Sequence, residues 1–68
     1  MIDIKTLRTP DDIGRWVEYV DGMGNVDHGR LKGWNDKYVF VVFKCDDSWH
    51  RFLDYTGQSC DPADVSFQ

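Results

Sequence analysis

An uninterrupted apolar run at residues 38–43, Tyr-Val-Phe-Val-Val-Phe, dominates the hydrophobic pattern of this chain. A strand with one face in water alternates apolar and polar residues, whereas a strand covered on both faces is apolar throughout. The run therefore predicts the central strand of a small sheet. Together with residues 28–34 it predicts a β-hairpin that extends from His28 to Cys45.

The turn of this hairpin allows two registers. A two-residue loop at residues 35–36 suits side chains that tolerate positive φ, and it pairs Leu31 with Phe40. In that register one face of the second arm carries Tyr38, Phe40 and Val42. A slip by one residue exchanges the two faces of a strand, so the choice decides which side chains enter the core.

A three-residue loop instead pairs Leu31 with Val41 and Trp34 with Tyr38. It moves a different set to the core, namely Val39, Val41 and Phe43. We favour this register because it places Arg30 and Lys32 on the face opposite Leu31, although a left-handed Lys37 argues against it.

Strand signals recur along the rest of the chain. The five expected strands cover residues 16–20, 28–34, 38–44, 55–60 and 65–67. In the first of them, Val17 and Tyr19 are expected inward and Glu18 outward. Residues 2–7 alternate weakly and predict an edge strand or an arm that covers the core.

The turns are marked by aspartate, which accounts for eleven of the twelve acidic residues. Its short side chain bonds to nearby backbone amides and favours turns and caps over helix interiors. Thr9-Pro10 predicts one helical turn, residues 46–48 predict the cap of a second turn that carries Trp49, and residues 61–64 predict a 3₁₀ turn. A glycine-rich loop is expected at residues 21–25.

Five short strands with tight turns favour a barrel, because closure removes exposed sheet edges. The order of features resembles the small SH3-like barrels of the Tudor and KOW type over residues 13–67. The similar segments are Gly14-Arg15-Trp16-Val17-Glu18-Tyr19, Gly29-Arg30-Leu31, the apolar strand 39–43 and Pro62-Ala63-Asp64-Val65. The resemblance implies a mainly β, SH3-like five-stranded barrel with one or two short helical turns. It would be a single domain over residues 1–68, in which residues 1–12 form an N-terminal arm and helical turn.

The chain also resembles small uncharacterised proteins of phages and prophages. The similarity lies in Gly29-Arg30-Leu31-Lys32-Gly33-Trp34-Asn35-Asp36 and in Phe40-Val41-Val42. This resemblance implies an origin, and with it a modulator or inhibitor of a host factor.

Charge is distributed unevenly in this chain, whose net charge is −4. Residues 28–45 carry four lysine or arginine side chains against one aspartate, whereas eleven acidic residues lie elsewhere. In the three-residue register one outward face gathers cations and aromatics, and we take it as the candidate binding site: Arg30, Lys32, Trp34, Tyr38, Phe40 and Lys44. Such a face suits a protein partner or the stacking of nucleic-acid bases. The plainer interpretation is a solvated β-surface whose aromatics are covered by Ile2, Ile4 and Trp49.

Enzymatic and metal chemistry find little support. There is no phosphate-binding glycine loop, and the two cysteines and two histidines lack the close spacing of zinc ligands. We therefore expect no catalytic residues, no metal and no cofactor, and expect Cys45 and Cys60 to be small buried apolar residues. No stretch matches a membrane span or a signal peptide, so a cytoplasmic location without membrane contact is expected.

The sequence thus predicts a non-enzymatic module that binds another macromolecule. A protein partner is favoured, because a net charge of −4 opposes attraction to phosphates. The alternatives are a nucleic-acid-binding barrel that uses hairpin 28–45, and a homo-oligomer that buries the second face of the apolar strand.

Overall fold

The computed structural model describes residues 1–68 and shows a mainly β protein. Five antiparallel strands form one sheet in the order β4-β3-β2-β1-β5. The strands are β1 (Trp16–Val20), β2 (Val26–Trp34), β3 (Val39–Val42), β4 (Gln58–Cys60) and β5 (Val65–Phe67). The expected strands are all present, although the fourth begins at Gln58 rather than at Tyr55.

Three short 3₁₀ turns lie between and before the strands: η1 (Ile4–Thr6), η2 (Trp49–Asp54) and η3 (Pro62–Asp64). The η3 turn was predicted, and the Asp61 carboxylate caps it by accepting a hydrogen bond from the Ala63 amide at 2.9 Å. The η2 turn was also predicted, but the Ser48 side chain makes no capping bond. Asp46 and Asp47 instead adopt positive φ angles of 50° and 64°, and so reverse the chain before η2.

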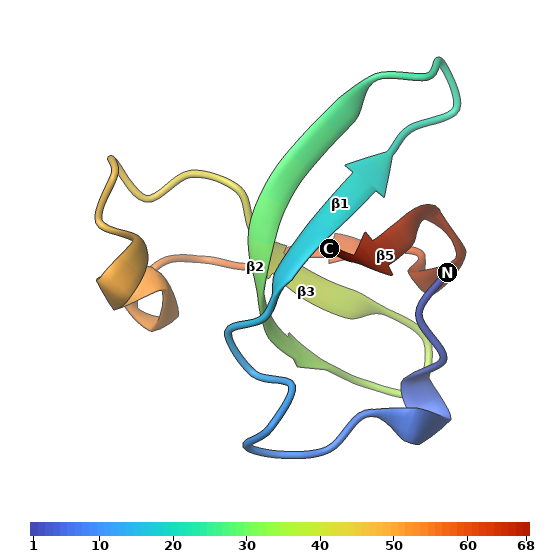
Figure 1. The fold of residues 1–68 in the computed structure, drawn as a ribbon, viewed down its shortest axis with the longest axis horizontal. Coiled ribbons are helices and arrows are strands. Elements are labelled where there is room, and N and C mark those ends of the chain that lie inside the picture. The colour runs from blue at the N-terminus through green and yellow to red at the C-terminus, as the bar shows by residue number, and fades with distance from the viewer.

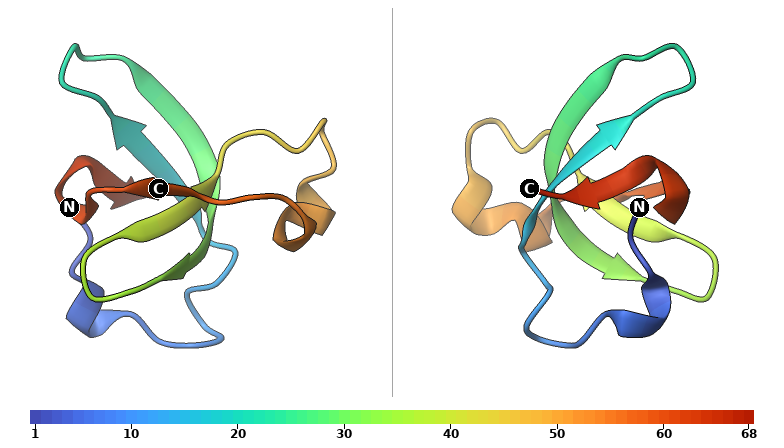
Figure 2. Two further views of the ribbon diagram at one scale, coloured as in Figure 1. Left: turned by 180° about the vertical axis from the view of Figure 1, so that it is seen from behind. Right: turned by 45° about the vertical axis from the view of Figure 1, so that its right-hand side comes forward.

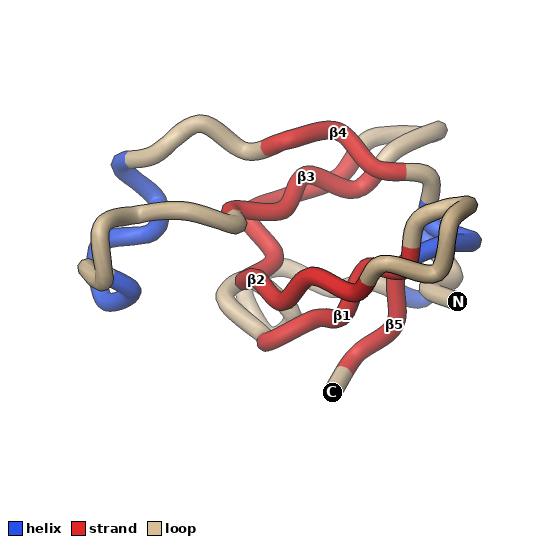
Figure 3. The backbone as a smooth tube through the Cα atoms, turned by 90° about the horizontal axis from the view of Figure 1, so that it is seen from above, coloured by secondary structure: helices blue, strands red, loops and turns tan.

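The strand β2 occupies the middle of the sheet and belongs to two layers. Its first half pairs with β1, from Val20↔Val26 to Trp16↔Arg30, and its second half pairs with β3 from Arg30↔Val42 onward. Figure 3 shows β3 and β4 in one layer, β1 and β5 in the other, and β2 passing between them. The expectation that the apolar run forms the central strand is therefore wrong, because β3 lies one position nearer the edge.

The main core lies between these layers and draws on every strand. Its fully or nearly buried members are Ile2, Leu7, Val17, Leu31, Val39, Val41, Cys60 and Val65. Val17 and Tyr19 point toward this core as the alternation of β1 predicted. Burial of these side chains removes apolar surface from water, which is the main favourable term in folding.

The apolar run is covered on both faces, as its composition predicted. Val39 and Val41 enter the main core, whereas Val42 points the other way and joins a second small cluster with Cys45 and Phe52. The segment around η2 supplies that cover (Figure 1).

The register of the hairpin follows the three-residue prediction at one end only. Leu31 pairs with Val41 as expected, but a bulge between Leu31 and Gly33 shifts the register, and Trp34 pairs with Val39 rather than with Tyr38. The loop therefore spans residues 35–38, where the Asn35 amide donates to the Tyr38 carbonyl at 2.9 Å. The extra residue lets the loop close without a left-handed Lys37.

The sheet is not closed into a barrel, which corrects the closed form of the prediction. β4 pairs only with β3 and β5 pairs only with β1, so the two outer strands share no ladder. Each outer strand has three residues, and η3 turns the chain between them.

The N-terminal arm covers the core instead of forming an edge strand. The Ile2 amide donates to the Pro62 carbonyl at 2.9 Å, and Ile2 and Leu7 are buried. Figure 2 shows the arm beside the turn between β4 and β5.

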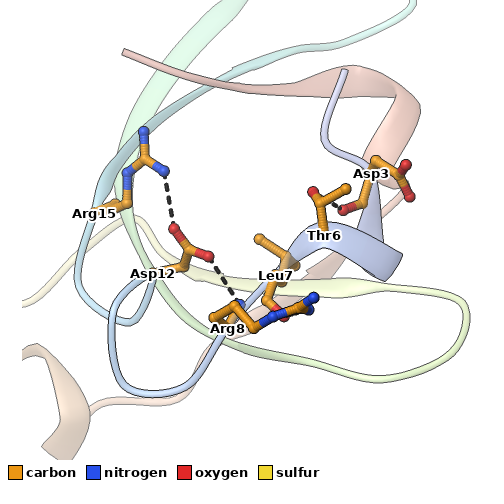
Figure 4. A network of polar contacts seen from close by, with 6 residues as sticks. All are labelled: Asp3, Thr6, Leu7, Arg8, Asp12 and Arg15. Carbon is orange, nitrogen blue, oxygen red and sulfur yellow. Dashed lines mark hydrogen bonds and ion pairs between the residues drawn. The ribbon is translucent and has the colours of Figure 1, made fainter.

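The helical turn expected at Thr9-Pro10 is an irregular turn in the structure. The Asp12 carboxylate accepts hydrogen bonds from the Arg8 amide at 2.8 Å and the Arg15 guanidinium at 2.9 Å (Figure 4). Asp12 therefore acts as the local organiser, in place of the expected Thr9 cap.

We predict that Gly29→Ala destabilises the protein by about 2–3 kcal/mol. A Cβ atom at Gly29 would lie 2.5 Å from the Val42 carbonyl oxygen and 2.7 Å from Val41 Cγ1. Gly33→Ala is the matched control, because no atom lies within 4 Å of its Cβ position, and we expect a change within about 0.5 kcal/mol. Urea unfolding measures both variants, and equal effects would contradict the proposed crowding at Gly29.

We also predict that the protein becomes less stable at low pH. The Arg15 guanidinium and the Arg8 amide lower the pKa of Asp12, and the amides of Asn25 and Met23 lower the pKa of Asp21. A carboxyl whose pKa is lower in the folded state stabilises the fold above its unfolded pKa, here 3.8, and loses that contribution as the pH falls. Urea unfolding between about pH 2 and pH 6 should show a smaller loss for Asp12→Asn/Asp21→Asn than for the wild type.

Candidate binding surface

The six residues of the expected binding face do not share one surface. The bulge in β2 reverses the direction of the side chains that follow it, so Trp34 packs partly against the main core beside Val39. Lys44 follows the end of β3 and lines a different groove, with Asp27 and Phe43. The bulge thus separates Trp34 from the expected face, and the end of β3 separates Lys44 from it.

Arg30 holds the sheet to the η2 segment. Its Nε donates to the Gly14 carbonyl at 2.7 Å, and its Nη1 donates to the Trp49 carbonyl at 2.9 Å. The guanidinium carbon lies 4.3 Å from the centre of the Phe52 ring and 5.6 Å from that of Trp16. A cation above aromatic faces gains electrostatic stabilisation as well as burial of its stem. Arg30 is therefore a structural cation rather than a free surface charge.

Lys32 is engaged in a similar way. Its ammonium donates to the Tyr55 carbonyl at 2.6 Å, which holds the chain where it returns toward β4. The stem of Lys32 lies 3.4 Å from the position of a Cβ at Gly57. Two of the four cations of the hairpin are thus committed to backbone carbonyls of the segment 43–57.

A shallow aromatic hollow remains on the hairpin. Its volume is about 370 Å³, and its lining consists of Lys32, Gly33, Trp34, Phe40 and Gly57. A Cβ atom at Gly57 would lie 3.1 Å from Phe40 Cβ, so a side chain there would crowd the hollow. Phe40 and Trp34 are half-buried in its walls, and Tyr38 follows at the adjacent turn with 45% of its surface exposed. The structure therefore brings together Lys32, Trp34 and Phe40 of the expected site, with Tyr38 next to them.

The remaining chemistry is sparse. Both cysteines are free and buried, as predicted, and burial raises the pKa of each thiol. No three His, Cys, Asp or Glu side chains gather in a way that could hold a metal ion. His28 contacts the side chain of Gln68, and His50 is exposed at the start of η2.

The sequence reasoning missed the surface of the β1–β2 hairpin. Val20 and Val26 form a cross-strand pair and are 39% and 47% exposed, and Met23 at the tip is 89% exposed. Figure 1 shows this hairpin extending beyond the rest of the sheet. The signal was present in the sequence, because valine flanks a glycine-rich loop on both sides.

Comparisons of the chain with protein-family models, with curated proteins and with solved structures found no match. The structure contains no helix with the length and apolar character needed to cross a membrane. The fold therefore defines the class of this chain as a small mainly β domain with a five-stranded antiparallel sheet.

We predict that Arg30→Met lowers the free energy of unfolding by about 2–4 kcal/mol, because it removes two hydrogen bonds from a charged donor. Lys37→Met is the matched control, since the Lys37 side chain is exposed, and we expect a change within about 0.5 kcal/mol. Urea unfolding measures both. Equal stability of Arg30→Met and the wild type would show that the guanidinium does not hold η2 to the sheet.

Proposed function

We propose that this chain is a non-enzymatic protein-binding module of the SH3-like type, and that the aromatic hollow on the β2–β3 hairpin contacts the partner. The observation that supports the proposal is a hollow lined by Trp34 and Phe40 together with Lys32, Gly33 and Gly57, with the exposed ring of Tyr38 at the adjacent turn. Tryptophan, tyrosine and phenylalanine are enriched at protein interfaces, where they fill pockets on the partner.

The strand order also supports the SH3-like part of the proposal. β5 lies beside β1, and β2, β3 and β4 follow one another as a meander, with a 3₁₀ turn before β5. The two outer strands approach each other at η3, because the four connecting residues, 61–64, span at most about 14 Å. We regard the domain as an open relative of such barrels.

A protein partner is preferred to nucleic acid because of the way the cations are used. Arg30 and Lys32 donate to backbone carbonyls, which leaves Lys37 and Lys44 as the exposed cations of the hairpin. The net charge of −4 repels phosphate at longer range. Two separated lysines provide too little attraction for phosphate to offset that repulsion.

The resemblance to phage and prophage proteins suggests a bacterial host factor as the partner, which the module inhibits or redirects. The cytoplasm is the proposed location, and two free thiols are compatible with its reducing conditions.

We predict that Tyr38→Glu weakens the binding of the specific partner of this module. The immobilised protein is exposed to a bacterial lysate, and proteins retained by the wild type are identified by mass spectrometry and then titrated in purified form. A charge at Tyr38 would be buried against the partner, and we expect binding to weaken at least about tenfold.

Leu53→Glu is the matched control, because Leu53 is an exposed apolar residue of η2 that does not line the hollow, and it should leave binding unchanged. Equal binding by Tyr38→Glu and the wild type would remove the aromatic hollow from the proposal. Retention of nucleic acid rather than protein, with salt-sensitive binding lost in Lys37→Glu/Lys44→Glu, would favour the alternative function.

A further inference from the structure

The backbone of β2 has a free edge along its first half. In an antiparallel pair, residues that exchange hydrogen bonds alternate with residues whose groups point away from the partner strand. The Leu31 amide donates to the Arg15 carbonyl at 2.9 Å, and the Asp21 amide donates to the Asn25 carbonyl at 3.0 Å. Every second residue of β2 between Asn25 and Leu31 therefore bonds to β1, and Asp27 is one of them. The residues on either side of Asp27, Val26 and His28, direct their amides and carbonyls away from β1.

No other strand takes up these groups. The pairing of β3 with β2 begins at Arg30↔Val42, and the chain leaves the sheet after Val42. None of the hydrogen bonds formed outside the ladders involves the backbone of Val26 or His28. Both residues are exposed, so the edge is open to solvent.

A groove of about 400 Å³ adjoins this edge at Asp27 and His28. The rest of its lining comes from β3 and the residues after it, Val41, Phe43 and Lys44, and from Thr56 and Gln58 before and in β4. The groove therefore lies between the open edge of β2 and the residues that follow the end of β3. An added strand is the kind of ligand that matches both the unpaired backbone and this shape.

The negative charge of the β1–β2 hairpin favours an added strand that carries positive charge. Residues 16–29 contain three acidic side chains, Glu18, Asp21 and Asp27, and no lysine or arginine. Exposed apolar side chains at Val20, Met23 and Val26 accompany them. Lys44 is the single lysine in the groove lining, which also contains Asp27. A second copy of this chain would bring two acidic hairpins together, so it is a poor occupant.

We propose that an extended segment of another protein, bearing lysine or arginine beside apolar residues, adds as a strand to β2 at Val26 and His28. Its backbone bonds to the free amides and carbonyls, and one of its cations lies against Asp27. This site is separate from the aromatic hollow, and each can bind without the other.

The test uses a display library of short random peptides, selected on the immobilised full chain, followed by titration of the synthetic peptides that are enriched. We expect peptides that alternate basic and apolar residues. His28→Pro should weaken their binding at least about tenfold, because proline lacks the amide that faces the groove. His28→Thr is the matched control, since it loses the same side chain but keeps the amide.

Proline is tolerated on an edge strand where the missing amide would face solvent, so His28→Pro is expected to fold. Amide hydrogen exchange on the wild type gives a second measurement that needs no variant. The bound peptide should slow exchange at Val26 and His28. Tyr38→Glu should bind the peptides normally, which separates this site from the aromatic hollow.

Three outcomes would overturn the proposal. They are the absence of any enriched peptide, equal binding by His28→Pro and His28→Thr, and unchanged exchange at Val26 and His28 when peptide is bound. Self-association of the chain through the same edge, measured by sedimentation, would also replace the foreign segment with a second copy.

Discussion

The close approach of β3 to β2 at Gly29 is the constraint on which the fold depends. The carbonyl oxygen of Val42 would lie 2.5 Å from a side-chain carbon at this position, so the two strands approach more closely than any other residue allows. That approach lets one strand pair with β1 in one layer and with β3 in the other (Figure 3). A chain of 68 residues thereby encloses a core with a single sheet, without the second sheet that a sandwich requires.

Next to Gly29, Arg30 connects the sheet to the segment before β1 and to η2. It donates to carbonyls before β1 and at η2, and its charge lies against the ring of Phe52. Lys32 extends the same arrangement to Tyr55. These bonds also reduce the number of free cations on the hairpin, because side chains that donate to backbone carbonyls are less available to bind phosphate. The proposal of a protein partner therefore rests on this arrangement as well as on the net charge.

Much of the fold could be predicted from local patterns. The apolar run 38–43 indicated a doubly covered strand, the alternation around Glu18 indicated β1, and Asp61-Pro62 indicated η3. The candidate site was less accessible, because one bulge at Lys32 reverses Trp34 without a distinctive residue type to mark it. The carbonyl partners of Arg30 lie sixteen and nineteen residues away along the chain, and no local pattern encodes such contacts. The open edge at Val26 and His28 depends likewise on where β3 ends.

The two tethers of the segment 43–57 have a consequence for how such a domain can diversify. Arg30 and Lys32 hold this segment through the carbonyls of Trp49 and Tyr55, and a carbonyl is present in every amino acid. Arg30 and Lys32 thus bind the backbone of the segment rather than its side chains. A few of its side chains, such as Phe52, also pack against the sheet. Substitutions of the outward side chains of this segment therefore leave the acceptors of both tethers in place.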